Sequence, residues 1–595
     1  MTPMKKIVAS SKEPIVVLHG DEMAQVAFER ILDVLVRPYV DMEIIERDLS
    51  ARNRILTQGA VVAHAIEDLK KHKIGVKNAG ITVNAEQKRA IYDALQQEGA
   101  KLPPVDSLPA AAVKSPNGAI RKGLGGNISR EEIPFANIQK RIPEWKGRDV
   151  RVSHPLSSGM RAAFSCASPA SGMATLEHIN ASGETRSLHS RPVGEGDPLL
   201  LATACADELA RWAAHFFETA LELKKNAYVA LKDTVVPGYD GVMRAIIDDI
   251  FKEKFAERFR EAGIFYRYGL IDAQAADMII SPPASALWGL PENEAGANFS
   301  ALVELLKKDG FPDRGQHISV SRMSAGGGDQ YNGYNAKAEE KGVIRLRVND
   351  KILHSVPVSA GDPVMFMSNE RAAIAAFVRR AFADAKEANE EIYFGFDEGG
   401  SEYDKVFAAV VREVYADLLR CCPERPPYML CSAGFLLQKM IADPPKRARY
   451  ALRNLDGDVF SDISAAYGGS LAMASSAIIG EDGACLYEAP HGTAPGLYEL
   501  YKKSGGKEAP FNPSALIFAF AEALRKRGER DRNSSLSRFG ETLRDALIKV
   551  TDEGNVTPDV ASCLRPGVPK RVVNLFECIS AVENEIDARY ACRVG

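Results

Sequence analysis

A repeated pattern in the middle of the chain is the feature that most constrains its fold. Short motifs recur once, in the same order, at separations that drift from 168 residues (152 against 320) to 162 residues (278 against 440). Chance matches would scatter, whereas a duplicated segment that later lost a few residues leaves such a drift. The matched motifs are Val152-Ser-His154 with Val320-Ser-Arg322, Gly196-Asp-Pro198 with Gly361-Asp-Pro363, Tyr228 with Tyr393, Tyr239-Asp240 with Tyr403-Asp404, and Met278 with Met440. Two tandem copies of one small unit are predicted.

Each copy has the pattern of a small α/β unit. In the second copy, alternating apolar residues predict a strand over 342–348, and helical periodicity predicts a long helix over 369–387. The 595 residues also exceed what one hydrophobic core supports. We predict a large domain split between 1–145 and 454–595, small-domain copies at 146–287 and 314–453, and a connecting segment at 288–313.

The flanking segments also alternate between strand and helix patterns. Residues 15–18 are an apolar run, residues 20–23 break it, and residues 27–36 continue with helical spacing. The Asn512-Pro513 pair predicts a helix start before 516–524. Residues 102–116 contain four prolines and predict an extended surface loop. The fold class is therefore α/β.

Composition excludes several functions. With 75 Lys and Arg against 79 Asp and Glu, the net charge of −4 leaves no basic excess for nucleic-acid binding. No apolar run reaches the length of a membrane-spanning helix, and the first 14 residues lack the apolar region of a signal peptide. Nine cysteines are too few for a disulfide scaffold and are expected to be reduced. We expect a soluble, cytoplasmic protein without nucleic-acid or membrane partners.

Two aspartates near the chain's end are candidate metal ligands. Asp458 and Asp462 are four residues apart, so a helix places both carboxylates on one face. A hard divalent cation such as Mg²⁺ or Mn²⁺ would relieve their repulsion. The alternative is that they are ordinary charges of a helix start.

Two further segments carry polar groups suited to anionic ligands. Lys114-Ser-Pro-Asn-Gly-Ala-Ile-Arg121, with Arg130, offers two arginine forks for carboxylates, although surface arginines are an alternative. Glu488-Ala-Pro-His491-Gly-Thr493-Ala494 offers glycine-exposed backbone that can approach a flat ligand or a phosphate. Neither a G-x-G-x-x-G fingerprint after a strand nor a P-loop motif is present in the sequence.

In order, these motifs resemble one family over nearly the whole chain: the dimeric, type II isocitrate dehydrogenases among the β-decarboxylating dehydrogenases. The segments that carry the resemblance are Gly20-Asp-Glu-Met23, Lys77-Asn-Ala-Gly-Ile-Thr82, 114–121, Leu124-Gly-Gly126, Arg130, Lys232-Asp-Thr234, Tyr239-Asp-Gly241, Leu270-Ile-Asp272, 454–462, His491-Gly-Thr493 and Asn512-Pro513. The resemblance implies an isopropylmalate/isocitrate dehydrogenase-like fold, with a mixed sheet in the split large domain and two tandem small domains.

The same resemblance implies an activity and its residues. The reaction is the metal-dependent oxidative decarboxylation of isocitrate, a step of the tricarboxylic acid cycle, with hydride transfer to a nicotinamide cofactor. The implied substrate-binding residues are Ser115, Asn117, Arg121, Arg130, Arg322 and Thr82. The implied cofactor-binding residues are Lys77, Thr82, Arg89, Glu488, His491, Gly492, Thr493, Ala494, Asn512 and Asp277. The implied ligands of Mg²⁺ or Mn²⁺ are Asp272, Asp458 and Asp462.

The duplication divides the family's small-domain residues between the two copies. In family dimers this domain gives an arginine and a tyrosine to its own site, and a lysine and an aspartate to the partner's site. Here the second copy has Arg322 and Tyr331, whereas the first has Lys232 and Asp272. The opposite positions hold His154, Asp397 and Gly434. We therefore predict an active monomer, a pseudo-dimer with one site, in which Tyr331 protonates the enolate and Lys232 polarises it or relays protons. Beside a metal, the pKa of both groups is expected nearer neutrality.

The cofactor is predicted to be NAD. NADP-using members of the family carry Arg-His just beyond the H-G-T motif, where this chain has Pro495-Gly496-Leu497. Family Gln and Lys positions on the partner-side helix become Asp277 and Ile280. A carboxylate can accept hydrogen bonds from a ribose diol and repels a 2′-phosphate. Gly80, in place of a hydroxyl residue, departs from the family near the nicotinamide.

Two other interpretations stay open at this point. The first is another β-decarboxylating dehydrogenase, acting on homoisocitrate, 3-isopropylmalate or tartrate; Ser115 and Asn117 favour isocitrate, a tricarboxylate. The second is a non-catalytic scaffold derived from this fold. The complete set Lys232, Asp272, Arg322 and Tyr331 argues against lost activity.

Overall fold

The computed structural model describes residues 7–139, 144–155, 161–309, 315–324, 329–397, 399–421, 427–480 and 482–591. The chain forms two compact units. Unit 1 combines Met1–Arg141 with Ala465–Gly595, and unit 2 is Ile142–Ser464. The predicted domain limits at 145 and 454 lie a few residues from these divisions. None of the helices described is long and apolar enough to cross a bilayer.

Unit 1 is built on a mixed sheet, in the order β6-β23-β24-β5-β2-β4. The pairs β24–β5, β5–β2 and β2–β4 are parallel, whereas β23 runs antiparallel to both of its neighbours. These strands are β2 (Ile15–His19), β4 (Ile44–Asp48), β5 (Ile74–Lys77), β6 (Asn127–Glu132), β23 (Ala474–Ile479) and β24 (Cys485–Glu488). Segments from both ends of the chain therefore form one sheet, as predicted for a split domain.

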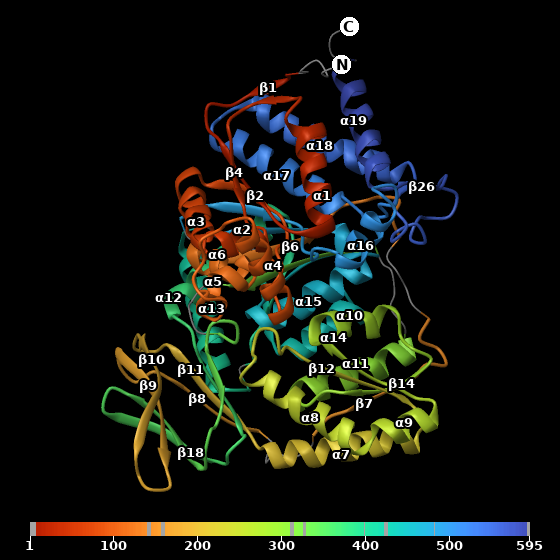
Figure 1. The fold of residues 1–595 in the computed structure, drawn as a ribbon. Helices are drawn as coiled ribbons and strands as arrows, with labels where there is room; N and C mark the ends of the chain where they lie inside the picture. Colours follow the sequence, from red (N-terminus) through yellow and green to blue (C-terminus); the bar gives the residue numbers. More distant parts are fainter. Residues whose placement is uncertain are drawn as a thin grey trace. The chain divides into compact units, whose positions relative to one another are not determined.

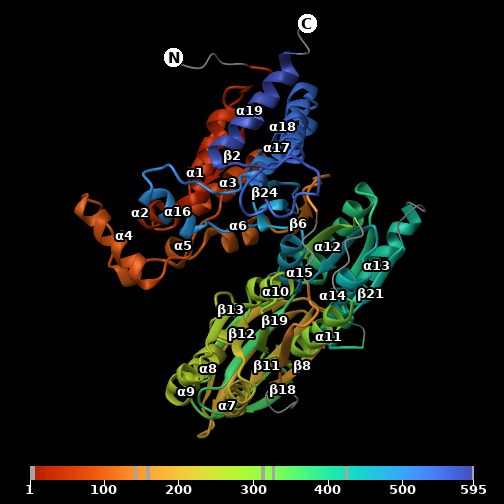
Figure 2. The same ribbon diagram turned by 90° about the vertical axis from the view of Figure 1, so that its right-hand side faces the viewer.

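Helices cover both faces of this sheet. On one face α17 packs on β5, β23 and β24, and α18 and α19 pack beside it (Figure 1 and Figure 2). On the other face α3 packs on β2, β4 and β5. Ile15 and Val17 belong to the first core, and Val16 and Leu18 to the second. Burial on both faces explains why residues 15–18 are continuously apolar.

The remaining elements of unit 1 connect these layers. The 3₁₀ turn Val105–Ser107 and the short α5 lie in the segment predicted as an extended loop, because its Ala-rich end can form a helical turn. The helices are α1 (Glu22–Ile31), α2 (Ala51–Leu56), α3 (Ala60–His72), α4 (Ala85–Gln97), α5 (Ala110–Val113), α6 (Pro116–Leu124), α16 (Pro495–Lys503), α17 (Ser514–Arg530), α18 (Ser534–Asp552) and α19 (Leu575–Ala591). A π-helical turn (Leu32–Val36) extends α1, and β1 (Ala9–Ser10) with β3 (Val40–Asp41) and β25 (Asn555–Val556) with β26 (Arg571–Val572) form two small sheets.

Unit 2 contains two runs of elements in the same order. The first run is β7 (Asp149–Ser153), β8 (Arg161–Ala167), β9 (Gly172–Asn180), β10 (Thr185–Val193), β11 (Pro198–Ala204), α7 (Ala206–Glu222), β12 (Asn226–Leu231), α8 (Asp240–Lys254), α9 (Ala256–Ala262), β13 (Tyr266–Leu270), α10 (Ile271–Ile280), β14 (Ser285–Gly289) and α11 (Asn293–Asp309). The second run is β15 (His317–Met323), β16 (Tyr334–Lys337), β17 (Gly342–Val348), β18 (Lys351–Val358), β19 (Pro363–Ser368), α12 (Arg371–Glu387), β20 (Glu391–Gly395), α13 (Glu402–Cys421), β21 (Tyr428–Cys431), α14 (Ala433–Ala442), β22 (Arg447–Leu452) and α15 (Asn454–Tyr467). The strand predicted over 342–348 and the long helix predicted over 369–387 are confirmed as β17 and α12.

Each run contributes one group of parallel strands, and the registers of the two groups match. The orders are β13-β12-β14-β7 and β21-β20-β22-β15. Ala230 pairs with Gly269 in the first group, and Gly395 pairs with Cys431 in the second. These residues hold equivalent places when the two runs are aligned.

Two antiparallel sheets join the runs, in the orders β16-β19-β11-β8 and β10-β9-β17-β18. At their centres, β11 pairs with β19 and β9 pairs with β17. Leu201 pairs with Phe366, which is its equivalent in the second run. The two runs are thus related by an approximate two-fold axis at the centre of unit 2.

Candidate functional site

In unit 2, strand ends from both runs bring a charged cluster together, which we define as Lys232, Asp272, Arg322, Tyr331 and Asp458. Lys232 directly follows β12, and Asp272 lies in the first turn of α10, directly after the neighbouring parallel strand β13. Arg322 lies near the end of β15, and Asp458 lies in the first turns of α15, which follows the neighbouring parallel strand β22. The carboxyl ends of parallel strands meet at one sheet edge, so each run supplies one pair.

The cluster is a network of buried ion pairs and hydrogen bonds. Lys232 pairs with Asp272, and its Nζ atom lies 3.1 Å from Asp458 Oδ2. Arg322 pairs with Asp458, and the Tyr331 hydroxyl donates to Asp458 Oδ2 at 2.6 Å. Lys232, Asp272, Arg322 and Asp458 are each at most 8% exposed. Water-excluded charges of this kind interact strongly, which is typical of catalytic sites.

The cluster fixes the protonation of its lysine and tyrosine. Burial alone would lower the pKa of Lys232, but Asp458 and Asp272 outweigh it and raise the pKa above the ordinary value. Burial, and then the Asp458 carboxylate, raise the pKa of Tyr331 well above its ordinary value, although Arg322 opposes this. Both shifts run opposite to the expected shift toward neutrality, because two carboxylates surround these groups. Lys232 is therefore a cation and Tyr331 retains its proton at neutral pH.

The carboxylates of the cluster suit a divalent cation. Asp272 Oδ1 is buried and lacks a hydrogen-bond partner among the described residues. Oxygen ligands of this type are those that Mg²⁺ and Mn²⁺ prefer. The described residues contain no group of three His, Cys, Asp or Glu side chains gathered for a metal. Lys232 bridges Asp272 and Asp458, and Asp462 lies one turn farther along α15, so the three-carboxylate set remains a prediction.

A second layer of polar contacts holds Tyr331 in place. The buried carboxylate of Asp329 accepts hydrogen bonds from the backbone N–H of Tyr331 at 3.0 Å and from Asn454 Nδ2 at 2.8 Å. Asn454 begins α15, the helix that carries Asp458. Asp329 therefore ties the Tyr331 loop to that helix. Asn454 lies in a quoted motif and Asp329 adjoins Tyr331, but sequence reasoning missed this link because it depends on tertiary contact.

In unit 1, a second group of predicted residues lies at the carboxyl ends of β5 and β24. Lys77 and Glu488 are register partners in these parallel strands, and their side chains form a buried ion pair at 2.7 Å. Arg121 Nη2 lies 3.4 Å from Glu488 Oε1. Burial alone would raise the pKa of Glu488, but Lys77, Arg121 and Arg130 lower it to about 2. Glu488 therefore organises three cations at one place.

The predicted substrate residues of α6 and the preceding loop contact one another. Ser115 is the N-cap of α6, its Oγ donates to the Gly80 carbonyl at 3.1 Å, and its N–H donates to Thr82 Oγ1 at 3.0 Å. A Cβ atom at Gly80 would lie 3.1 Å from the Pro116 ring. The missing side chain at Gly80 thus permits the close approach of the two loops. Asn117 Oδ1 is buried without a hydrogen-bond partner among the described residues.

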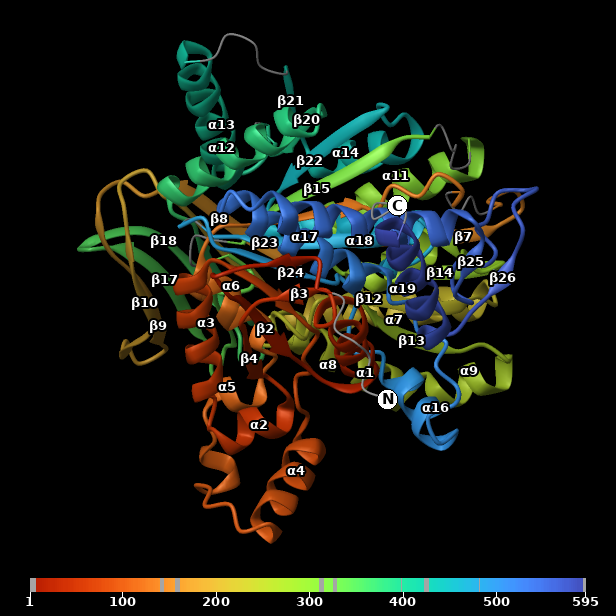
Figure 3. The same ribbon diagram turned by 90° about the horizontal axis from the view of Figure 1, so that it is seen from above.

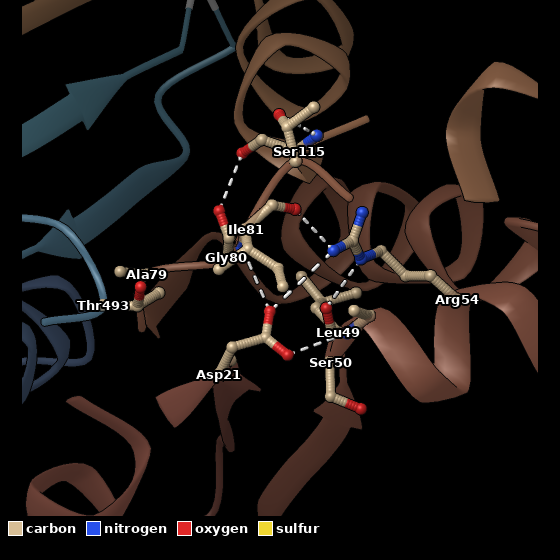
Figure 4. Close-up of polar contacts among 12 residues, drawn as sticks. Asp21, Leu49, Ser50, Arg54, Ala79, Gly80, Ile81, Ser115 and Thr493 are labelled. Carbon is tan, nitrogen blue, oxygen red and sulfur yellow. Dashed lines mark hydrogen bonds and ion pairs between the residues drawn. The ribbon is translucent and has the colours of Figure 1, made fainter. Parts of the chain in front are cut away.

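A buried arginine that sequence reasoning missed fixes these two loops. Arg54 of α2 is fully buried and donates to the carbonyls of Leu49 (2.9 Å), Ile81 (2.7 Å) and Lys114 (Figure 4). Asp21 Oδ2, 3.8 Å from Arg54, accepts from the Ile81 N–H at 3.0 Å (Figure 4). Burial lowers the pKa of Arg54 and raises that of Asp21. The loops carrying Thr82 and Ser115 are therefore positioned from behind by one guanidinium. The only sequence signal was Asp21 within a family motif.

The remaining predicted cofactor residues lie in different surroundings. His491 is buried, which lowers the pKa of its imidazole, and Ala494, the N-cap of α16, has a φ angle of +56°. The Asn512 side chain donates to Asp559 at 3.1 Å and caps the Ser514 N–H. Arg89 is exposed on α4 at an edge of unit 1, away from β24 and α17, where it pairs with Asp93 (Figure 3).

Four predicted residues need only a short account. Arg130 is buried in β6, and its strand position pairs with Ser476 of β23. Thr493 contacts the Glu22 carboxylate through its hydroxyl, and Gly492 precedes it with open space around its Cα atom. Asp277 lies on α10 in unit 2, where burial raises the pKa of its carboxyl.

The fold and the two groups of residues define an α/β protein with cation-lined anion sites and a buried acid–base cluster. The sequence model of the isocitrate/isopropylmalate dehydrogenase family matches residues 433–576. These residues include α15 with Asp458 and β24 with Glu488.

Comparison with characterised proteins narrows this class to homologues of isocitrate dehydrogenases. The mitochondrial isocitrate dehydrogenase [NADP] of Saccharomyces cerevisiae is 23% identical over 580 residues, which cover 97% of this chain and 93% of the yeast protein. Isocitrate dehydrogenase [NADP] 1 of Mycobacterium bovis is 32% identical over 266 residues, 44% of this chain and 61% of that protein. The Mycobacterium tuberculosis protein of the same name gives the same values.

Proposed function

We propose that the protein catalyses the oxidative decarboxylation of isocitrate to 2-oxoglutarate and CO₂, with a nicotinamide cofactor and Mg²⁺ or Mn²⁺. The buried charged cluster carries this proposal, because it joins a protonated tyrosine, a lysine cation and two carboxylates that suit a divalent cation. The names of the relatives support the substrate. The arginines and the Ser115 loop of unit 1 support a polycarboxylate ligand.

The residues of unit 1 would bind and orient the substrate. Arg121 and Arg130 would pair with its carboxylates, and Ser115 and Asn117 would donate hydrogen bonds to the carboxylate that distinguishes isocitrate from smaller acids. The Asn117 amide suits this role because its buried Oδ1 lacks a partner among the described residues. Lys77, His491 and the backbone around Gly492 and Ala494 would bind the cofactor.

The residues of unit 2 would supply charge and a proton. Tyr331, whose hydroxyl proton is held by Asp458, would protonate the carbanionic carbon left by decarboxylation. Lys232 would stabilise the negative oxygen of that intermediate or return a proton to Tyr331. A divalent cation bound by Asp272 and Asp458, with Asp462, would act as a Lewis acid toward the substrate's hydroxyl and carboxylate oxygens. Arg322 would hold a substrate carboxylate.

The proposal includes NAD as the preferred cofactor, although the named relatives are NADP enzymes. Pro495-Gly496-Leu497 begins α16 without a cation that could pair with a 2′-phosphate. Asp277 is an acid at a place where the resemblance expects a polar or cationic residue. A buried carboxylate disfavours a phosphate through desolvated like charge.

The proposal also includes a duplicated small domain within a chain that is active as a monomer. The equal order of elements and the equal strand registers of the two runs support the duplication. The cluster supports the monomer, because Lys232 and Asp272 of the first run contact Asp458 of the second run within one chain. Residues that family dimers draw from two subunits would thus come from one polypeptide.

One assay tests the activity and the cofactor. Isocitrate, Mn²⁺ and NAD are expected to give NADH absorbance at 340 nm, with kcat/KM for NAD above that for NADP. Homoisocitrate, 3-isopropylmalate and tartrate serve as substrate controls, and a chelator is expected to abolish turnover. A higher kcat/KM for NADP would reject the cofactor assignment alone. Turnover of none of these acids with either cofactor would reject the enzyme.

A further inference from the structure

The sequence of α11 repeats that of α15, beyond the motifs that defined the duplication. Asn293, Gly296, Phe299 and Ser300 fall opposite Asn454, Gly457, Phe460 and Ser461, at a constant separation of 161 residues. This value continues the drift from 168 to 162 in the preceding motifs. The segment between the two runs is therefore the counterpart of the helix that carries Asp458 and Asp462. Those two aspartates fall opposite Ala297 and Ala301.

The structure places α11 and α15 in equivalent surroundings. Gly289 at the end of β14 pairs with Ser153, just as Ala451 of β22 pairs with Ser321. A Cβ atom at Gly296 would lie 2.2 Å from His154 Cβ, and one at Gly457 would lie 2.4 Å from Arg322 Cβ. His154 and Arg322 are themselves matched residues of the repeat. Each helix thus approaches its own parallel sheet through the same glycine and at the same strand end.

The charged cluster consequently has a counterpart in which every charged residue differs. The counterparts of Arg322, Asp458, Asp462, Asp272 and Lys232 are His154, Ala297, Ala301, Gly434 and Asp397, in that order. A Cβ atom at Gly434 would lie 2.0 Å from Asn298 Oδ1, so the Asn298 side chain fills the space that a carboxylate there would need. The residue matched to Asn298 is Val459. Ala297 and Ala301 are exposed.

We propose that β7, α11 and α14 form a silenced second site, defined as His154, Ala297, Ala301, Asp397 and Gly434. A divalent cation requires several oxygen ligands, and this site offers only one carboxylate, that of Asp397. The chain therefore binds one catalytic divalent cation rather than two. This inference rests on the proposed function for the identity of the cation, and on the matched geometry of α11 and α15 for the existence of the site.

Restoring the missing carboxylates tests the silenced site. The variant Ala297→Asp, Asn298→Val, Ala301→Asp, Gly434→Asp copies the residues of the charged-cluster side. Mn²⁺ bound per chain is counted from the loss of the free-ion EPR signal. The restored variant is expected to bind one Mn²⁺ more than the natural chain. An equal count in the two proteins, with unchanged circular dichroism, would overturn the inference.

The natural chain's own count judges the proposed function separately. One Mn²⁺ per chain, lost in Asp458→Asn, agrees with it. A natural chain that binds no Mn²⁺ would count against the proposed metal dependence, while the difference between the two proteins would still test the silenced site. Two Mn²⁺ in the natural chain, with one kept in Asp458→Asn and lost in Asp397→Asn, would show that the second site is functional and overturn the inference.

A simpler pair of variants avoids the buried Gly434. Ala297→Asp with Ala301→Asp changes only exposed positions and places two carboxylates beside Asp397. Glu304→Asp with Lys308→Asp makes the same i,i+4 pair farther along α11 and is the matched control. The first variant is expected to bind the additional Mn²⁺ at least tenfold more tightly than the control. Equal affinities would overturn the inference without any change to the core.

Discussion

Arg54 shows how one side chain can determine the geometry of a binding loop that it does not reach. Its guanidinium donates to three backbone carbonyls, two of which belong to the segments that carry Thr82 and Ser115. A buried guanidinium is costly unless each N–H finds an acceptor. The hydrogen bonds to Leu49, Ile81 and Lys114 meet that demand and fix both loops.

Replacing Arg54 is therefore expected to weaken substrate binding more than turnover. In Arg54→Lys the planar fork is lost, and a single ammonium leaves carbonyls unpaired, at roughly 1–3 kcal/mol each. KM for isocitrate should rise at least tenfold with a smaller change in kcat, as measured by initial rates. Arg52→Lys on the same helix, whose side chain is exposed and pairs with Glu98, is the control. If both variants raise KM equally, Arg54 is not a positioning residue.

At the scale of elements, the Lys77–Glu488 pair links two parallel strands that come from opposite ends of the chain. The pair lies at the last residue of both β5 and β24. A buried carboxylate with three neighbouring cations is strongly stabilised in its charged form. Losing it would leave the cations of Lys77, Arg121 and Arg130 uncompensated at this sheet edge.

This pair predicts a definite pH dependence of stability. The pKa of Glu488 is about 2 in the folded chain and about 4.5 in the unfolded chain. Its stabilisation is therefore complete above pH 4.5 and is lost as the pH falls toward 2. In Glu488→Gln the free energy of unfolding should fall by on the order of 3 kcal/mol at pH 7. Urea unfolding should show this deficit shrinking below pH 4.5; a deficit that does not change with pH would contradict the assignment.

Sequence alone predicted the elements better than the contacts between them. The strand over 342–348, the helix over 369–387 and the split large domain followed from periodicity and repetition. The 102–116 segment was harder, because proline marks it as irregular while its alanines form a helical turn. The contacts of Arg54, Asp329 and Asn454 left no periodic trace, since each joins segments distant in sequence. The placement of Arg89 on an exposed helix was likewise not readable from its motif.

At the scale of the whole molecule, the charged cluster depends on both runs of unit 2. Lys232 and Asp272 come from the first run, and Arg322, Tyr331 and Asp458 come from the second. Within a single chain these groups already contact one another. A second subunit is not needed to supply any member of the cluster.

Mixing two inactive variants tests this arrangement. Lys232→Met and Tyr331→Phe should each lower kcat at least a hundredfold, because each removes a group proposed to handle charge or a proton. Their mixture should regain no activity, and sedimentation should find activity at the mass of one chain. Recovery on mixing, or activity only in a species of twice the chain mass, would show that sites are shared between chains.

The pairing of β11 with β19 also affects how the chain is made. Residues 198–204 of β11 lie between β8, which is already synthesised, and β19, which is about 165 residues away. At ribosomal rates of 5–20 residues per second, β19 emerges roughly 10–30 s after β11. During that interval β11 exposes a buried, entirely apolar strand edge. The nascent chain is therefore expected to need protection by a chaperone at this stage, which is a cost of joining two domains into one polypeptide.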